Sequence, residues 1–291
     1  MVGEKVSVCL DKLGKHLNFF RNINEVGETM NYSRLFSFFI MLALSAVCYS
    51  DDGPTDYDGI NLNVLGAMQY EVCQLNPGMD LEDAERQTKL AGAEFARLDL
   101  DLGIITFTPF YDHADAVNTT ADYITMVYGS IPAMGEAWDK WEQSEGAAKV
   151  MKGRDKVGKC HFKFNYIDYK YMDVEQLENS DRRVVQTEWC TRRPGVSKDD
   201  LAKQHKSWLA ETKEKSNFIG WAIIHPRLGQ GNAPGDFFHF FIYDSVGDLM
   251  KDEEWLANGG GMQGADEYYN SYVDCSGPSV WSGTIAQRPS N

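Results

Sequence analysis

Two histidines in the second half of the chain form a pattern typical of a chemical site. His225 ends an apolar segment, residues 219–225, and His239 lies within the next one, residues 236–243. If these segments are neighbouring strands of a hairpin, the two imidazoles meet beside Trp221 and Tyr243. Two neutral imidazoles so close together could hold a metal or haem iron, or share a proton.

Two glutamates form a second candidate pair. Glu71 lies two residues before Cys73, and Glu188 lies two residues before Cys190. On a strand, that spacing places each glutamate on the same face as its cysteine. One interpretation is a pair of carboxylates that face a shared cavity, one of them with a raised pKa. The alternative is that each glutamate pairs with a neighbouring backbone group or tyrosine hydroxyl.

Four cysteines follow the segment that we interpret as a leader: Cys73, Cys160, Cys190 and Cys275. An even number of cysteines in an exported chain indicates disulfides, and four cysteines allow three connectivities. A four-cysteine zinc site is the first alternative, but the C-x2-C spacing of such sites is missing. A catalytic pair of thiols is the second alternative.

The elements that must position these residues follow from an internal repeat. An offset of 117 residues superimposes several uncommon residue types at once, which predicts a duplication. The superimposed residues are Glu71 and Cys73 on Glu188 and Cys190, Pro77-Gly78 on Pro194-Gly195, Pro109 on Pro226, and Trp138 on Trp255. At the same offset Thr108 corresponds to His225, so the histidine pair is confined to the second copy.

Each copy predicts the element order β-α-β-β-α-β, an α+β fold of the ferredoxin-like type. The first strand, residues 67–75 or 184–192, ends at the Pro-Gly turn, and a helix with an apolar stripe follows at about 80–100 in the first copy. His205 occupies that stripe in the second copy and is expected to be a core residue. We place the first module at residues 51–171, a linker at 172–183 and the second module at 184–291.

Two such modules in one chain resemble the dimeric α+β barrel superfamily in a fused, single-chain form. The resemblance covers residues 67–285 and rests on element order and duplication, without a signature motif of any member family. It implies two sheets that pack face to face around a pocket. It also implies a cofactor-poor oxygenase, an isomerase or a haem-dependent oxidoreductase, with His225 or His239 as ligand or base and Glu188 as a second acid or base.

The resemblance also selects one cysteine connectivity. In a ferredoxin-like sheet the first and last strands are neighbours. The expected disulfides are therefore Cys73–Cys160 and Cys190–Cys275, one in each module.

Residues 1–50 are interpreted as a leader, with a signal peptide at about 30–50. Arg34 precedes an apolar run at 35–47, and small residues at Cys48 and Ser50 favour cleavage before Asp51. Synthesis from Met30 would explain the polar residues upstream, and a signal anchor is the alternative. We expect export to the periplasm or the cell exterior, without a stable membrane span once the signal is removed.

The composition excludes some partners. The net charge is −15, which disfavours nucleic acid and anionic lipid surfaces. A hydrophobic fraction of 43% is ample for a packed core, so disorder of the main body is excluded. We expect a monomer with pseudo-twofold symmetry, because a fused pair already buries the surface through which single modules would dimerise.

Two functions follow as hypotheses. The first is a non-catalytic role: binding a small, partly apolar molecule between the sheets, with Glu71, Tyr123, Trp221 and Tyr243 in the pocket, or acting as an extracytoplasmic interaction module. The second is an oxidoreductase, oxygenase or isomerase with a site at His225, His239 and Glu188. No metal centre is predicted, and the sequence leaves both the cofactor and the choice between enzyme and binding protein open.

Overall fold

The computed structural model describes residues 56–57, 60–61, 64–112 and 121–289. The predicted leader and its cleavage site lie outside these residues. None of the helices within the described ranges is long and apolar enough to cross a membrane. A short antiparallel pair, β1 (Asp56–Tyr57) and β2 (Ile60–Asn61), precedes the main sheet.

The main elements fall into two halves of similar order. The first half, residues 66–172, contains β3 (Gly66–Leu75), α3 (Leu81–Arg97), β4 (Gly103–Tyr111), β5 (Tyr123–Ser130), α4 (Ile131–Glu142), α5 (Glu145–Val157) and β6 (Gly158–Met172). A short helix, α6 (Val174–Glu178), connects the halves. The second half, residues 182–287, contains β7 (Arg182–Arg192), α7 (Lys198–Thr212), a 3-10 turn (Lys213–Lys215), β8 (Gly220–Pro226), β9 (Phe237–Tyr243), α8 (Val246–Asn258), α9 (Gly261–Ser271), β10 (Val273–Cys275) and β11 (Ser279–Gln287).

Corresponding residues begin the helices of the two halves. Gly78 and Gly195 follow the prolines of the predicted turns with φ of 85° and 90°, a left-handed conformation that favours glycine. Asp80 then caps α3 and Ser197 caps α7, each through a capping box. The side chains of Ser130 and Ser245 cap α4 and α8 in the same way, by accepting a hydrogen bond from a backbone N–H of the first turn.

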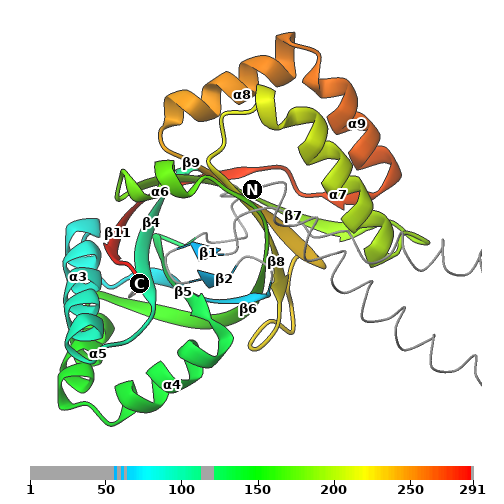
Figure 1. The fold of residues 1–291 in the computed structure, drawn as a ribbon. Helices are drawn as coiled ribbons and strands as arrows, with labels where there is room; N and C mark the ends of the chain where they lie inside the picture. The colour runs from blue at the N-terminus through cyan, green and yellow to red at the C-terminus, as the bar shows by residue number, and fades with distance from the viewer. Residues whose placement is uncertain (1–55, 58–59, 62–63, 113–120, 290–291) are drawn as a thin grey trace, which may run out of the picture. The chain divides into compact units, whose positions relative to one another are not determined.

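Eight strands close into one antiparallel barrel. The first-half strands pair in the order β4-β5-β3-β6, and the second-half strands pair in the order β8-β9-β7-β11. The edge strands of the two sheets then pair with each other, β6 with β8 and β11 with β4, which closes the sheet. Figure 1 shows α3, α4 and α5 on one side of the barrel and α7, α8 and α9 on the other.

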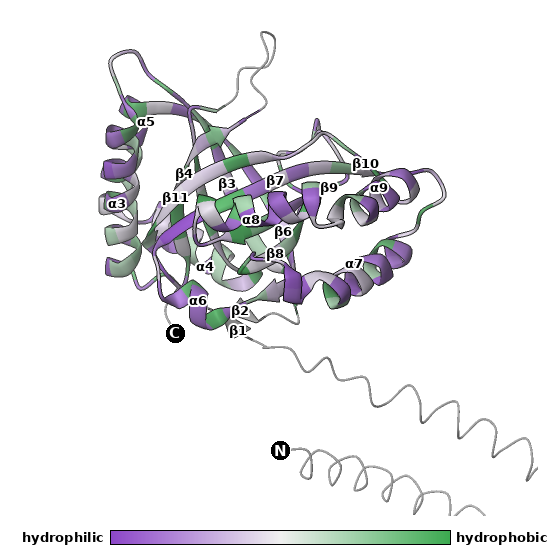
Figure 2. Ribbon diagram, turned by 90° about the horizontal axis from the view of Figure 1, so that it is seen from above, coloured by the Kyte–Doolittle hydropathy of each residue, from purple (hydrophilic) through white to green (hydrophobic). Residues whose placement is uncertain are grey.

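The barrel wall separates three apolar layers. Met68, Ile105, Ile224 and Phe240 belong to the core inside the barrel. Outside it, one core packs beneath α3, α4 and α5, and another packs beneath α7, α8 and α9. Figure 2 shows hydrophilic and hydrophobic residues mixed along α3 and α7, as expected for helices that bury one stripe.

The α+β class, the antiparallel sheets and the barrel are confirmed, but several details differ from the prediction. The two sheets join edge to edge instead of facing each other as separate layers. Each half also holds an extra helix, α5 or α9, and the last strand of the second half is interrupted after Cys275. The predicted linker includes α6, whose Leu177 is fully buried in the barrel core. Descent of the two halves from one duplicated module remains a prediction.

Candidate functional site

Two cavities lie outside the barrel, each between the strands and the helices of one half. The first-half cavity, beneath α3, α4 and α5, has a volume of about 480 Å³. The second-half cavity, beneath α7, α8 and α9, has a volume of about 130 Å³. Inside the barrel the core leaves a cavity of only about 60 Å³. The predicted pocket between the sheets is therefore present only as this small cavity, because apolar side chains from both halves fill most of that space.

The first-half cavity has the size and lining of a small-molecule site. Ligand pockets in proteins typically measure about 300–1,000 Å³ and are mainly apolar with a few polar groups. The polar groups here include Glu71, Tyr123 and Arg154, which come from β3, β5 and α5. The apolar walls include Phe95, Ile104, Trp138, Trp141, Met151 and Phe162.

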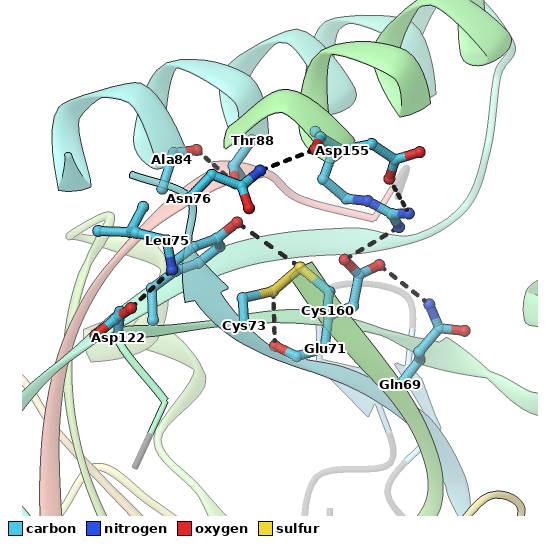
Figure 3. Close-up of a disulfide and its surroundings, with 12 residues drawn as sticks. Gln69, Glu71, Cys73, Leu75, Asn76, Ala84, Thr88, Asp122, Asp155 and Cys160 are labelled. Carbon is cyan, nitrogen blue, oxygen red and sulfur yellow. Dashed lines mark hydrogen bonds and ion pairs between the residues drawn. A yellow bond between two sulfur atoms is a disulfide. The ribbon is translucent and has the colours of Figure 1, made fainter. Parts of the chain in front are cut away.

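Glu71 places a buried carboxyl group on the wall of this cavity. It is 8% exposed, and its nearest described cation is Arg154, with 3.6 Å between Oε2 and Nη1. The side-chain amide of Gln69 donates a hydrogen bond of 3.4 Å to Oε1 (Figure 3). Burial raises the pKa of Glu71 to about 7, although Arg154 and Gln69 both act to lower that pKa. At neutral pH this carboxyl group is therefore about half protonated.

Arg154 carries hydrogen-bond donors that the described residues leave unused. Its Nη2 atom donates to Asp155 Oδ1 at 2.8 Å, and its Nη1 atom forms the ion pair with Glu71, but among the described residues neither Nε nor Nη1 donates a hydrogen bond. The guanidinium carbon lies 4.7 Å from the centre of the Phe162 ring, which supports the group from one side. Buried donors without acceptors are costly, so this arrangement favours an acceptor in the cavity.

Tyr123 lies near Glu71 and the first-half disulfide. Its hydroxyl oxygen is 3.7 Å from the Cys160 sulfur, and its side chain lines the cavity. Burial, assisted by the negative charge of Glu71, raises the pKa of Tyr123 to about 12. The phenol is therefore neutral at physiological pH and serves as a hydrogen-bonding group.

The structure contains both expected disulfides, Cys73–Cys160 and Cys190–Cys275. Each joins directly opposed residues of neighbouring strands, β3 with β6 and β7 with β10. The four-cysteine zinc site is therefore wrong, because the four sulfurs are bonded in pairs. Disulfides are typical of proteins that fold in an oxidising compartment. In both halves the glutamate oxygen and the two sulfurs lie within 4.8 Å of one another, as the strand spacing predicted.

A chain of hydrogen bonds crosses the second-half cavity. Trp221 Nε1 donates to His239 Nδ1 at 3.2 Å, and His239 Nε2 is 2.9 Å from the Tyr268 hydroxyl. The same hydroxyl is 2.8 Å from His205 Nε2. The indole is only a donor, so the neutral His239 ring must carry its proton on Nε2 and donate to Tyr268. Tyr268 then donates to His205, which assigns the direction of the whole chain.

Burial keeps both histidines of this chain neutral. It lowers the pKa of His205 to about 4 and the pKa of His239 well below its ordinary value. Burial also raises the pKa of Tyr268, so the phenol stays protonated. The chain is therefore a fixed set of neutral groups at physiological pH.

Two acidic residues also line the second-half cavity. Glu188 Oε2 accepts a hydrogen bond of 2.9 Å from the Tyr269 hydroxyl, which agrees with the tyrosine alternative considered for this glutamate. Asp252 accepts hydrogen bonds from both the backbone and the side-chain nitrogen of Asn217, each at 2.7 Å. Tyr243 donates to Gln186 at 3.4 Å, and burial near Asp252 raises its pKa far above the ordinary value.

The seven predicted site residues separate into two groups and one outlier. Glu188, Trp221, His239 and Tyr243 line the second-half cavity, whereas Glu71 and Tyr123 line the first-half cavity. The prediction that the two glutamates share a cavity is therefore wrong.

His225 is the outlier. Its side chain is 34% exposed, and its Nε2 lies 3.8 Å from Asp168 Oδ2. The structure brings His205, rather than His225, to His239, with 5.4 Å between ring centres. The predicted meeting of His225 and His239 is wrong because His225 lies farther along β8, beyond Ile223, the residue that faces His239.

Sequence reasoning missed the residues that the extra helices supply. Arg154 comes from α5, and Tyr268 and Tyr269 come from α9. His205 was expected in the core and is indeed buried, but it also belongs to the hydrogen-bond chain. Ala265, Tyr268 and Tyr272 recur at helical spacing and could have indicated α9.

Haem does not fit either cavity in the described structure. The second-half cavity is far below the size of drug-sized pockets, and both nitrogens of its His239 already form hydrogen bonds. The described lining of the first-half cavity contains no histidine. We therefore derive no chemistry through haem.

Comparisons with known proteins give no family. No protein-family model matches the sequence, and no curated protein matches it. The chain is similar to a monooxygenase candidate from Fusobacterium nucleatum, at 11% identity, 78% coverage of this chain, 95% of the other and a TM-score of 0.47. It is also similar to a monooxygenase candidate from Lactobacillus acidophilus (9% identity; 78% and 97% coverage; TM-score 0.45) and to chlorite dismutase from Candidatus Nitrospira defluvii (8%; 75% and 90%; 0.43). Similarities at this level carry no functional argument for this chain.

Proposed function

We propose that the protein binds a small, largely apolar molecule with a carboxylate or similar anionic group in the first-half cavity. The observation that carries this proposal is the buried Glu71–Arg154 pair on the wall of a cavity of about 480 Å³. The apolar walls would enclose the body of the ligand. The Nε and Nη1 atoms of Arg154, which donate no hydrogen bond to the described residues, would bind its anionic group.

The electrostatics of the pair favour an anion. When Glu71 is protonated, the exposed Asp155 is the one close carboxylate that the described residues leave to Arg154. A planar guanidinium binds a carboxylate through two parallel hydrogen bonds, which are among the strongest in proteins. An anionic ligand would thus replace Glu71 as the counter-ion inside the cavity. Because ionised Glu71 would repel that ligand, binding should be coupled to protonation of Glu71.

The test compares 4-phenylbutyrate with its neutral analogue 4-phenylbutanol by calorimetric titration of residues 51–291. We expect saturable binding of the acid and at least tenfold weaker binding of the alcohol. Affinity for the acid should rise between pH 8 and pH 6, as Glu71 takes up its proton. Equal affinity for the two probes would contradict the proposal.

Two variants locate the site. Arg154→Met removes the cation but keeps an unbranched side chain, and should weaken binding of 4-phenylbutyrate by about tenfold to a hundredfold. Ala148→Trp changes an exposed residue at the cavity lining and should block entry without touching the charged pair. Glu188→Gln, in the other cavity, is the matched control and should leave the affinity unchanged. Unchanged binding in both first-half variants would place the ligand elsewhere.

The raised pKa of Glu71 favours one catalytic alternative at the same site. A general base works best when its pKa lies near the working pH, and Glu71 meets that condition. In an isomerase of this kind, Glu71 would take a proton from a carbon beside a carbonyl group. Arg154 would stabilise the resulting enolate, and Glu71 would return the proton. Catalysis by His225, His239 or Glu188 stays a prediction from the sequence.

Deuterium exchange separates binding from catalysis. An isomerase would incorporate deuterium from heavy water into the acidic C–H position of an uncharged aryl β-diketone, a probe that can bind while Glu71 is ionised and able to act as a base. Glu71→Gln would abolish that exchange and leave binding of 4-phenylbutyrate intact. Exchange at the same rate in the Glu71→Gln variant would exclude Glu71 as the base.

A further inference from the structure

We propose that the second-half cavity is a binding site for a small alkylammonium ion, of the size of tetramethylammonium. The proposal is independent of the function proposed for the first-half cavity. It rests on three properties of the second-half cavity: aromatic walls, buried carboxyl groups and a small volume.

Aromatic rings surround the cavity from both the strands and the helices. Trp221 and Phe241 stack with ring centres 5.5 Å apart, and Trp208 meets Trp221 edge to face at 4.9 Å. Because these rings pack against one another, they form a wall that is already in place before a ligand enters. Faces of tryptophan, tyrosine and phenylalanine attract cations, and aromatic cages are a recurring way to bind quaternary ammonium groups. The remaining aromatic lining residues are Phe218, Tyr243, Trp255, Tyr268 and Tyr269.

The charged residues of the lining are acidic. Glu188 from β7 and Asp252 from α8 are 8% and 7% exposed. Among the described residues that line the cavity, none is a lysine or an arginine. The two histidines of the lining are neutral at physiological pH. An anion would therefore find no positive partner in this cavity, whereas a cation would find two carboxyl groups.

One ammonium group already lies against the outside of this ring cluster. Lys213 Nζ is 4.3 Å from the centre of the Tyr171 ring and 5.6 Å from the centre of Phe218, a lining residue. Lys213 itself does not line the cavity, although its positive charge acts on Asp252. One ring of the cavity lining, Phe218, thus already lies near a cation in the structure, and the charge of Lys213 would weaken binding of a second cation by repulsion.

The volume limits the ligand. An engineered protein cavity of about 150 Å³ holds benzene, so a cavity of about 130 Å³ suits a molecule of four to six heavy atoms. Tetramethylammonium has five, and larger ammonium compounds would not fit. Most polar groups of the lining already form hydrogen bonds with one another. A ligand would therefore be selected by its charge and by cation–π attraction.

The experiment is a calorimetric titration of residues 51–291 with tetramethylammonium chloride at constant ionic strength, beside tert-butyl alcohol as a neutral molecule of similar shape. We expect saturable binding of the cation and at least tenfold weaker binding of the alcohol. Sodium chloride replaces the probe in the blank titration. No saturable binding, or equal binding of the alcohol, would overturn the proposal.

Variants assign the binding to this cavity. Glu188→Gln keeps an acceptor for Tyr269, and Asp252→Asn keeps one for Asn217, so both should fold while losing a negative charge. Each should weaken binding of tetramethylammonium by about fivefold to tenfold, and Lys213→Met should strengthen it. The matched control is Glu71→Gln, which carries the same change in the first-half cavity and should have no effect. Equal loss in Glu71→Gln and Glu188→Gln would contradict the proposal.

Discussion

The two cavities differ in chemistry although the backbone around them is alike. In the first half, Asp122 Oδ2 accepts a hydrogen bond of 2.7 Å from the backbone of Leu75. In the second half, Asp236 Oδ2 accepts one of 3.0 Å from the backbone of Arg192, in the corresponding place. Each half also has its glutamate, its disulfide and its capped helices in matching positions. The difference must therefore come from side chains that face the cavities.

Four pairs of corresponding residues account for that difference. In three of the pairs a small or aliphatic side chain lines the first-half cavity, and in the fourth an arginine does, whereas rings occupy all four places in the second half, whose cavity measures about 130 Å³. The pairs are Thr88 and His205, Ile104 and Trp221, Thr125 and His239, and Arg154 and Tyr269. Arg154 and Tyr269 each precede the second cysteine by six residues, and each contacts the glutamate of its half. A cation beside Glu71 and a phenol beside Glu188 give the two cavities opposite charge preferences.

Removing a disulfide should have the largest effect and should be similar in both halves. The loops close over sequence separations of 87 and 85 residues. The chain-entropy account gives each about 4.5 kcal/mol of the free energy of unfolding. Urea unfolding of the double variants Cys73→Ala/Cys160→Ala and Cys190→Ala/Cys275→Ala measures both losses. A large loss in one half and none in the other would break the similarity of the two frameworks.

Acidification should stabilise the first half through Glu71. The folded-state pKa of Glu71, about 7, lies above its ordinary value of 4.5, so the folded state holds the proton more tightly. This contribution is complete below pH 4.5 and is lost as the pH rises through 7, a change of about 3 kcal/mol. Unfolding of the wild type and Glu71→Gln at pH 5 and pH 8 measures it. Identical pH dependence in the two proteins would show that Glu71 is not perturbed.

Acidification should destabilise the second half through His205. Its folded-state pKa, about 4, lies below the ordinary 6.5, so the folded state holds the proton less tightly. Stability is complete above pH 6.5 and falls by about 3 kcal/mol as the pH drops towards 4. The variant His205→Gln, which keeps a hydrogen-bonding side chain, should lose this acid sensitivity. If His205→Gln is as acid-sensitive as the wild type, His205 does not carry the effect.

Breaking the hydrogen-bond chain should lower the free energy of unfolding by less than the changes described above. His239→Phe leaves the Trp221 indole and Tyr268 with one partner fewer each, which we expect to reduce the free energy of unfolding by about 2 kcal/mol. Thr125→Val, at the corresponding position of the first half, is the control and should cost less than about 1 kcal/mol. Equal losses would mean that the chain adds no stability beyond packing.

Removing a helix cap should give the smallest loss of stability, and the losses in the two halves should be nearly equal. Ser130→Ala and Ser245→Ala each remove a side-chain acceptor at the start of a helix, worth about 1 kcal/mol. Thermal or urea unfolding should show nearly equal losses. Losses that differ by more than about 1 kcal/mol would indicate that α4 and α8 depend on different interactions.

The repeat in the sequence predicted the framework but not the cavities. Residues that recur at a fixed offset identified the turns at Gly78 and Gly195 and the α+β class, and the ferredoxin-like resemblance built on that repeat gave both disulfides. The extra helix α5 was missed because its sequence has four lysines and arginines and two glycines among thirteen residues, which weakens the apolar stripe. The cavities depend on contacts between α5 or α9 and distant strands, and local periodicity does not determine such contacts.

His225 and His205 show the same limit at the level of single residues. His225 lies on β8, where the pairing register places Ile223 opposite His239, so His225 lies one position farther along the same face. His205 lies on α7, and its ring reaches His239 from the helix. The sequence predicted the strands and the helix but not how the helix packs on the strands, so it selected the wrong histidine.

The central claim is that the two cavities select ligands of opposite charge, and one cross-titration tests it most directly. Wild type, Arg154→Met and Glu188→Gln are each titrated with 4-phenylbutyrate and with tetramethylammonium. The account predicts that Arg154→Met weakens binding of the anion and leaves binding of the cation unchanged, whereas Glu188→Gln weakens binding of the cation and leaves binding of the anion unchanged. If either variant weakens the binding of both ligands equally, or of neither ligand, the two cavities do not have the separate roles proposed for them.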